Sequence, residues 1–162
     1  MDGLQALTAK PAVYRFMFDG AAPQRDFLAE RMDPLIAGAA ASGLGLWILE
    51  RPGAPAGGAV MLEANPAARE AELSYLLDPA LWGRGLALRM AWTAVTLAFR
   101  SPDIDCVFAG TDAPNTASLA VMQRLGMRFR REVVYPLGPG VEYELTRTDP
   151  GPQPPPPLLP VV

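Results

Sequence analysis

Two glycines, Gly83 and Gly85, stand between a short apolar segment and a longer apolar segment with helical spacing. The first segment, residues 73–77, ends at the turn pair Asp78-Pro79 and predicts a buried strand. Residues 86–99 repeat apolar side chains every three or four positions and predict a helix. A glycine turn between a strand and a helix exposes backbone N–H groups at the positive end of the helix dipole. The stretch therefore predicts an anion site, above all for phosphate.

Groups that could move a proton are few in this chain. It has no histidine, and Lys10 and Cys106 are its only lysine and cysteine. A general base must therefore be a carboxylate, a tyrosine, the cysteine or a water, and a histidine triad or zinc site is excluded. Cys106 lies in an apolar run, so we expect a plain buried thiol without a disulfide partner.

Composition bounds the class of protein. A chain of 162 residues, half of them apolar, is typical of one globular domain. The formal charge of -3 argues against a nucleic-acid partner, which normally requires a basic face. The N-terminus lacks the pattern of a signal peptide, and no apolar segment approaches the roughly 20 residues of a membrane span. We expect a cytoplasmic protein, a monomer or homodimer, with a small or cationic partner and no membrane or nucleic acid.

The first third of the chain predicts helices. Residues 2–9 read as a short helical turn that Pro11 ends. Pro23 suits the first position of a new helix, and Pro34 is expected to interrupt it, so that two short helices precede residue 44.

The rest of the chain alternates strands and helices. Residues 44–50, 57–63 and 73–77 predict a three-stranded antiparallel meander. Further along, the pattern predicts a strand, a helix closed by Gly126 and a terminal hairpin, over residues 104–111, 115–125, 129–135 and 141–145. We expect a domain over residues 1–149 and a disordered proline-rich tail over residues 150–162.

Three motifs in this order resemble the GNAT N-acetyltransferases, in particular the branch of ribosomal-protein N-terminal acetyltransferases. They are Ala71-Glu-Leu-Ser-Tyr75, Leu81-Trp-Gly-Arg-Gly-Leu-Ala87, and Asn115-Thr-Ala-Ser118 followed by Val121-Met-Gln-Arg-Leu-Gly126. The resemblance implies an α/β (α+β) fold: a mixed, mostly antiparallel sheet, splayed between its central strands and flanked by helices. The first strand of the family has no counterpart in this chain.

The resemblance also implies acetyl-CoA as cosubstrate. The turn and helix start would wrap the pyrophosphate, and the splayed strand would pair with the pantetheine arm. For Arg84 a phosphate contact and a solvated role are both open, and for Asn115 a cofactor contact and a helix N-cap are both open. The residues expected at the cofactor are Tyr75, Leu76, Leu77, Trp82, Gly83, Arg84, Gly85, Leu86, Ala87, Asn115 and Ser118.

The reaction implied is direct attack of a primary amine on the thioester in a ternary complex. Glu72 is the first choice for the general base, with Glu70 or a water as alternatives. In the family branch, the position of Ser118 donates a proton to the leaving thiolate; Tyr75 is a rival donor, and either side chain could instead be packing. A backbone N–H near Leu76 would polarise the carbonyl. The acceptor stays open among protein N-termini, amino acids, polyamines and aminoglycoside-like compounds, and the absence of an acidic cluster in the sequence argues against polyamines.

Two other readings remain. A nicotinamide-dependent oxidoreductase would use Gly83 and Gly85 as a dinucleotide fingerprint, but Leu88 stands where its third glycine belongs. A GNAT-fold protein that binds acetyl-CoA without catalysis, as a sensor or interaction module, is the stronger rival. Titration with acetyl-CoA and NADH distinguishes an acetyltransferase from the oxidoreductase. Turnover of amines distinguishes an acetyltransferase from the protein without catalysis.

Overall fold

The computed structural model describes residues 1–152, 154 and 155. The helices are α1 (Asp2–Thr8), α2 (Pro11–Tyr14), α3 (Arg25–Ser42), α4 (Leu86–Ala98) and α5 (Thr116–Arg124), with 3₁₀ turns η1 (Phe18–Gly20) and η2 (Pro79–Leu81). The strands are β1 (Leu46–Arg51), β2 (Ala54–Asn65), β3 (Glu70–Leu77), β4 (Cys106–Asp112), β5 (Arg128–Tyr135) and β6 (Gly138–Thr146). Most of the predicted tail, namely residues 153 and 156–162, lies outside the described residues.

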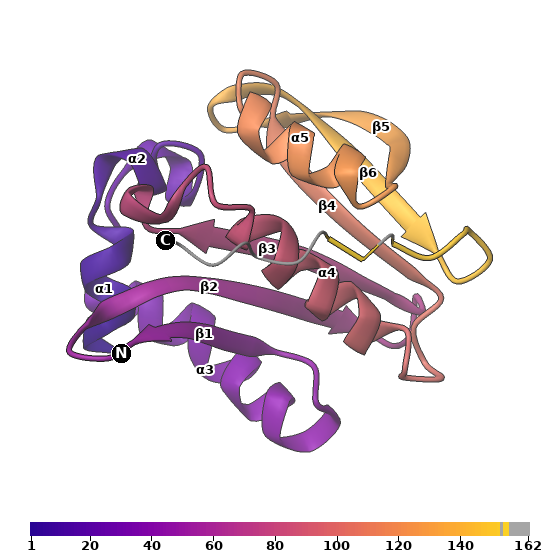
Figure 1. Ribbon diagram of the computed structural model, residues 1–162, viewed down its shortest axis with the longest axis horizontal. Helices are drawn as coiled ribbons and strands as arrows, with labels where there is room; N and C mark the ends of the chain where they lie inside the picture. The colour runs from indigo at the N-terminus through magenta and orange to yellow at the C-terminus, as the bar shows by residue number, and fades with distance from the viewer. Residues whose placement is uncertain (153, 156–162) are drawn as a thin grey trace, which may run out of the picture.

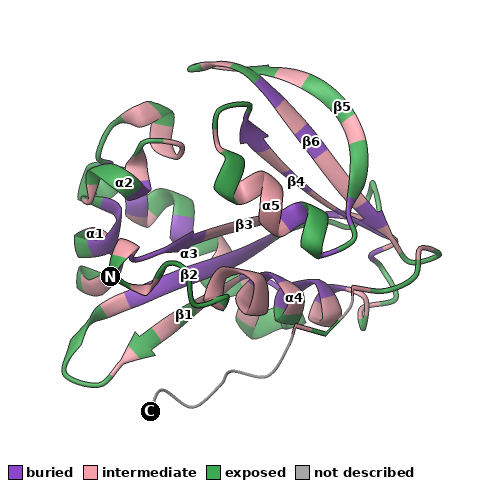
Figure 2. Ribbon diagram, turned by 45° about the horizontal axis from the view of Figure 1, so that its top comes forward, coloured by how far each residue is buried: buried purple, intermediate pink, exposed green. Residues whose placement is uncertain are grey.

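The described strands form one sheet in the order β1-β2-β3-β4-β6-β5. All neighbours are antiparallel except β3 and β4, which are parallel. The predicted meander and terminal hairpin are confirmed, and in the described part of the chain no strand precedes β1, which forms one edge. Figure 2 shows buried residues concentrated in the central strands, while β5 at the other edge is mostly exposed.

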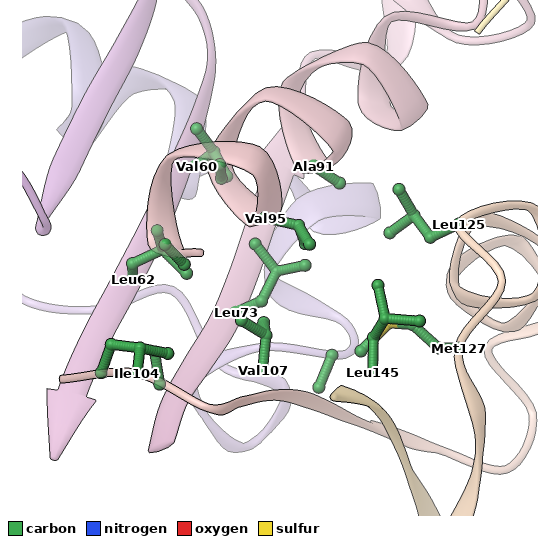
Figure 3. Packing of buried hydrophobic residues seen from close by; sticks show 14 of the residues in the cluster. Val60, Leu62, Leu73, Ala91, Val95, Ile104, Val107, Leu125, Met127 and Leu145 are labelled. Carbon is green, nitrogen blue, oxygen red and sulfur yellow. The ribbon is translucent and has the colours of Figure 1, made fainter. Parts of the chain in front are cut away.

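One face of the sheet carries α4 and α5 (Figure 1). Alternate residues of the strands point into this layer, including Leu62, Leu73 and Val107, and they pack against Val95 of α4 and Leu125 beyond α5 (Figure 3). A strand directs successive side chains to opposite faces, so Glu72 and Ser74 lie on the other face. There α1, α2 and α3 form a second cluster with β2 and β3.

The helices before β1 differ from the sequence prediction. Pro34 lies inside one continuous helix, α3, rather than between two short ones. The residues around it are largely exposed, so the backbone carbonyl left without a partner can reach solvent. Pro23 also precedes α3 instead of opening it, and its carbonyl accepts a hydrogen bond from Gln5 Nε2 at 2.9 Å. A residue far away in the sequence, Gln5, thus holds Pro23 outside the helix, whereas solvent exposure lets α3 continue through Pro34.

The parallel pair β3 and β4 separates soon after it forms. Ladder pairing joins only Glu70 with Cys106, Ala71 with Val107 and Glu72 with Phe108. Beyond these pairs β3 runs on to Leu77 and β4 to Asp112, and the two strands diverge (Figure 1). The predicted splay of the central strands is therefore present, and it opens the sheet between the two core layers.

Candidate active site

A cleft of about 680 Å³ occupies the opening between β3 and β4. Its walls come from the end of β3, the glycine turn with the start of α4, and the end of β4 with α5. On the other face of the sheet, Arg15, Phe16 and Met17 also line it. Of the predicted cofactor residues, all but one line this cleft: Tyr75, Leu76, Leu77, Trp82, Gly83, Gly85, Leu86, Ala87, Asn115 and Ser118. Arg84 is exposed and lies outside the lining.

The glycine turn has the backbone that an anion site requires. Gly83 and Gly85 take φ values of +74° and +69°, a region that favours glycine. Gly85 is the N-cap of α4, and no side chain caps the helix there. The first N–H groups of α4 therefore remain free to bind an anion at the positive end of the helix.

Trp82 fixes the turn to the strand before it. Its indole Nε1–H donates to the carbonyl oxygen of Leu77 at 2.9 Å, while about half of the residue remains exposed. The bond ties the start of the glycine turn to the end of β3, so that the two walls of the cleft keep their spacing. The sequence alone did not indicate this role for Trp82.

Two hydroxyl groups meet across the cleft. The Tyr75 hydroxyl oxygen lies 2.8 Å from Ser118 Oγ and 3.2 Å from the Ser118 carbonyl oxygen. Burial raises the pKa of Tyr75 to about 12, so the phenol keeps its proton at neutral pH. Asn115 orients this end of α5, because its Oδ1 accepts from the Ser118 N–H at 3.3 Å and its Nδ2 donates to Thr111 Oγ1 at 2.9 Å. Asn115 is thus the N-cap of α5 and also lines the cleft.

The two glutamates considered as bases have different surroundings. Glu70 accepts two hydrogen bonds from Arg130 Nη2, at 3.0 and 3.2 Å. Glu72 is exposed on the face opposite α5, at the last ladder pair before the strands part, and is not among the residues that line the cleft. Partial desolvation raises the pKa of Glu72, and the carboxylate of Glu63, directly opposite on β2, adds to the rise. Of the two, Glu72 is therefore the carboxylate more available to accept a proton, because Glu70 is held by Arg130.

The single cysteine is buried, as predicted. Burial, followed by the nearby Glu144 carboxylate, raises the pKa of the Cys106 thiol to about 11. A thiol in this state is a poor base and nucleophile at neutral pH. Cys106 therefore drops out of the list of bases that the composition left open.

An ion cluster that sequence reasoning missed supports the cleft. Asp78, only 2% exposed, accepts hydrogen bonds from Lys10 Nζ at 2.8 Å and Arg51 Nη2 at 3.1 Å, and its Oδ1 accepts from the Ala80 N–H at 3.1 Å. It joins the start of α2, the end of β1 and the turn before Gly83. The only local signal was Asp-Pro, which indicates a turn; its two partners are 68 and 27 positions away.

Asp78→Asn should destabilise the protein by about 2 to 3 kcal/mol, because the neutral amide no longer balances the charges of Lys10 and Arg51. In thermal unfolding this corresponds to a fall of roughly 4 to 10 °C for a domain of this size. The Lys10 hydrogen bond first, then that of the Ala80 N–H, lowers the pKa of Asp78 from 3.8. Its contribution is therefore present at neutral pH and is lost as the pH falls below about 4 through the lower folded value. An Asp78→Asn protein as stable as the wild type would contradict this role.

Two absences hold for the described residues. In residues 1–152, 154 and 155 no group of three or more histidine, cysteine, aspartate or glutamate side chains is arranged to hold a metal ion. Over the same range, no helix combines the length and apolar character needed to cross a lipid bilayer.

A parted pair of parallel strands, with a glycine turn that opens a helix beside them, defines the class of acetyltransferases with the GNAT fold. The family model described as Acetyltransferase (GNAT) domain matches residues 1–128, and the chain belongs to this family.

Solved structures with the same fold have low sequence identity to this chain. RimL, a ribosomal-protein alpha-N acetyltransferase in complex with coenzyme A, is 17% identical with a TM-score of 0.73, over 90% of this chain and 87% of that one. The spermidine N-acetyltransferase from Vibrio cholerae, in complex with CoA and spermine, is 16% identical with a TM-score of 0.72, over 90% and 88%. The yncA protein from Salmonella typhimurium, with its cofactor acetyl-CoA, is 15% identical with a TM-score of 0.67, over 90% and 84%.

Proposed function

We propose that this protein transfers the acetyl group of acetyl-CoA to a primary amine by direct attack in a ternary complex. The observation that carries the proposal is the parted β3–β4 pair, whose opening leads to the uncapped start of α4. Membership of the GNAT family and the fold neighbours that hold CoA or acetyl-CoA support the choice of cosubstrate.

The residues of the cleft fit coenzyme A. The free N–H groups at Gly85 and the first turn of α4 would bind its pyrophosphate, and a Cβ at Gly85 would project into open space where the phosphates are expected. The strand edge from Leu73 to Leu77 that faces the gap has no ladder partner on β4, so its amides can pair with those of the pantetheine arm.

In the reaction we propose, the amine nitrogen attacks the thioester carbonyl carbon and the carbon–sulfur bond then breaks. An alkylammonium has a pKa of about 10.4, so it must lose a proton before attack. Glu72 takes that proton through a water, and its raised pKa makes it a better base than an ordinary glutamate. Ser118, held by the Tyr75 hydroxyl, gives a proton to the departing thiolate and takes up the second proton that the amine nitrogen loses on becoming an amide, so the serine ends as a hydroxyl.

Glu72→Gln should lower kcat/KM for the amine about tenfold, since a water without its carboxylate partner remains as a weak base. Acetyl-CoA turnover, followed through release of the CoA thiol against a panel of primary amines, measures the change. In the wild type kcat/KM should fall as the pH drops through the raised pKa of Glu72, where the carboxylate gains a proton. Glu63→Gln is the matched comparison: it keeps the proposed base, so it should lower kcat/KM much less than Glu72→Gln, and it should move the pH profile to lower pH because it removes a carboxylate that raises the pKa of Glu72.

Two results would count against this function. If acetyl-CoA binds in isothermal titration but no amine is acetylated, the protein is a GNAT-fold sensor or interaction module without catalysis. If Glu72→Gln turns over as fast as the wild type, the enzyme uses another base.

A further inference from the structure

Tyr135, the last residue of β5, reaches the opening in the sheet from the face opposite α5. Its ring lies across Gly140 and its hydroxyl touches Gly110, which lines the cleft; a Cβ at either glycine would collide with it. Gly110 and Gly140 therefore make room for a phenol next to the end of the cleft on this face, which we call the second mouth; of these three residues only Gly110 lines the cleft. The first mouth, beside α4 and α5, is the one proposed for the cofactor.

Asp112 lies on this same face, two residues beyond Gly110 on β4. It pairs with Gly140 in the antiparallel ladder, and opposed residues of such a ladder point to the same side. Its carboxylate is therefore beside the Tyr135 ring, whereas Thr111 points to α5 and holds Asn115. Thr111 and Asp112, neighbours at the end of β4, thus point to opposite faces of the sheet beside the opening.

One oxygen of the Asp112 carboxylate is buried without compensation. The residue is 8% exposed, and within the described part of the chain its buried Oδ1 has no hydrogen-bond partner. A buried carboxylate oxygen without a donor is costly, so such a group calls for a reason. A bound cation that donates hydrogen bonds would supply one.

Most other carboxylates on this face are already neutralised. Glu142 accepts from Arg131 Nε at 2.8 Å and Nη2 at 3.0 Å, and Glu70 is bound by Arg130. Asp112 and Glu72 stand on the two strands that part, one on each side of the opening. Burial first, then the carboxylates of Glu142, Glu72 and Asp112, raises the pKa of Tyr135 to about 12, which places its hydroxyl among these negative charges.

We infer that Asp112 and the Tyr135 hydroxyl bind, at the second mouth, an ammonium group of the acceptor other than the amine that reacts. The acceptor is then a cationic amine without a carboxylate on the same short chain. This rests on the proposed acetyl transfer. The carboxylates form no metal site in the described residues. The sequence showed no acidic cluster because this one is assembled from separate strands.

The test uses three four-carbon amines that differ only at the far end. For the wild type, kcat/KM should fall from 1,4-diaminobutane through n-butylamine to 4-aminobutanoate, by at least tenfold between the first and last. Asp112→Asn should raise KM for the diamine about 10- to 100-fold, the loss expected for a hydrogen bond to a charged group, and leave the Kd of acetyl-CoA unchanged. Dialaninamide, tested beside them, should have a lower kcat/KM than the diamine, and a higher value would contradict the inference.

The matched control is Glu132→Gln. Glu132 is exposed on the same hairpin, but it pairs with Val141 and so points to the other face. If Asp112→Asn changes KM for the diamine no more than this control does, the inference is wrong while acetyl transfer stands. The same holds if kcat/KM of the wild type is equal for 4-aminobutanoate and the diamine. The comparison of amines needs no variant, so it decides the matter even if Asp112→Asn fails to fold. A wild type that binds acetyl-CoA but acetylates no amine overturns the proposed function itself.

Discussion

Gly85→Glu should weaken acetyl-CoA binding by more than 100-fold. The change places a carboxylate at the N-cap of α4, where the free N–H groups would otherwise bind the pyrophosphate. A Cβ at Gly85 meets no atom within 4 Å, so the new side chain fits without collision and occupies the phosphate position itself. Isothermal titration of the folded variant with acetyl-CoA measures the loss.

Two further variants separate the causes of this loss. Gly85→Ala adds only the strain of a positive φ, about 1 kcal/mol, and should keep most of the affinity. Gly53→Glu is matched to Gly85→Glu: Gly53 also has a positive φ, +68°, and open space around its Cβ position, but it lies in the turn between β1 and β2. It should bind acetyl-CoA like the wild type. If Gly53→Glu weakened binding equally, or Gly85→Glu weakened it little, the pyrophosphate would not be bound at this turn.

Local patterns predicted the part of the molecule in which neighbours in sequence are neighbours in space. The strand, glycine turn and helix of residues 70–98 form within one stretch of chain, and their apolar spacing and glycines contain most of the information required. The same holds for α5, with Asn115 as its N-cap and Gly126 after its end. The residues that line the side of the cleft proposed for the cofactor were therefore predictable nearly one by one.

The site proposed for the amine was not predictable, because its groups come from strands that meet only in the folded sheet. Asp112 and Tyr135 are 23 positions apart, and neither stands in a motif. Their proximity follows from the order β4-β6-β5 and from two glycines opposite the tyrosine ring. Likewise, the partners of Asp78 are Lys10, the N-cap of α2, and Arg51, at the end of β1. Charges that pair across a sheet leave no period in the sequence, whereas helices and turns do.

Ser118→Ala should lower kcat about 100-fold, because it removes the donor proposed for the departing thiolate. Tyr75→Phe should lower it about tenfold, since the serine keeps its own hydroxyl but loses the partner 2.8 Å away that orients it. Rates of thiol release at saturating acetyl-CoA and amine give both values. Ser118→Thr keeps a hydroxyl at the site and should retain activity within a few-fold.

The double variant shows whether the two hydroxyls act as one unit. If Tyr75 works through Ser118, removing both should cost no more than Ser118→Ala alone, because a group that orients another has nothing left to orient. If Tyr75 instead donates to the thiolate directly, the two losses should multiply to about 1,000-fold. If Ser118 only packs under the cofactor, Ser118→Ala should leave kcat nearly unchanged. The geometry favours the first result, because the Tyr75 hydroxyl lies within hydrogen-bond distance of both Ser118 Oγ and the Ser118 carbonyl oxygen.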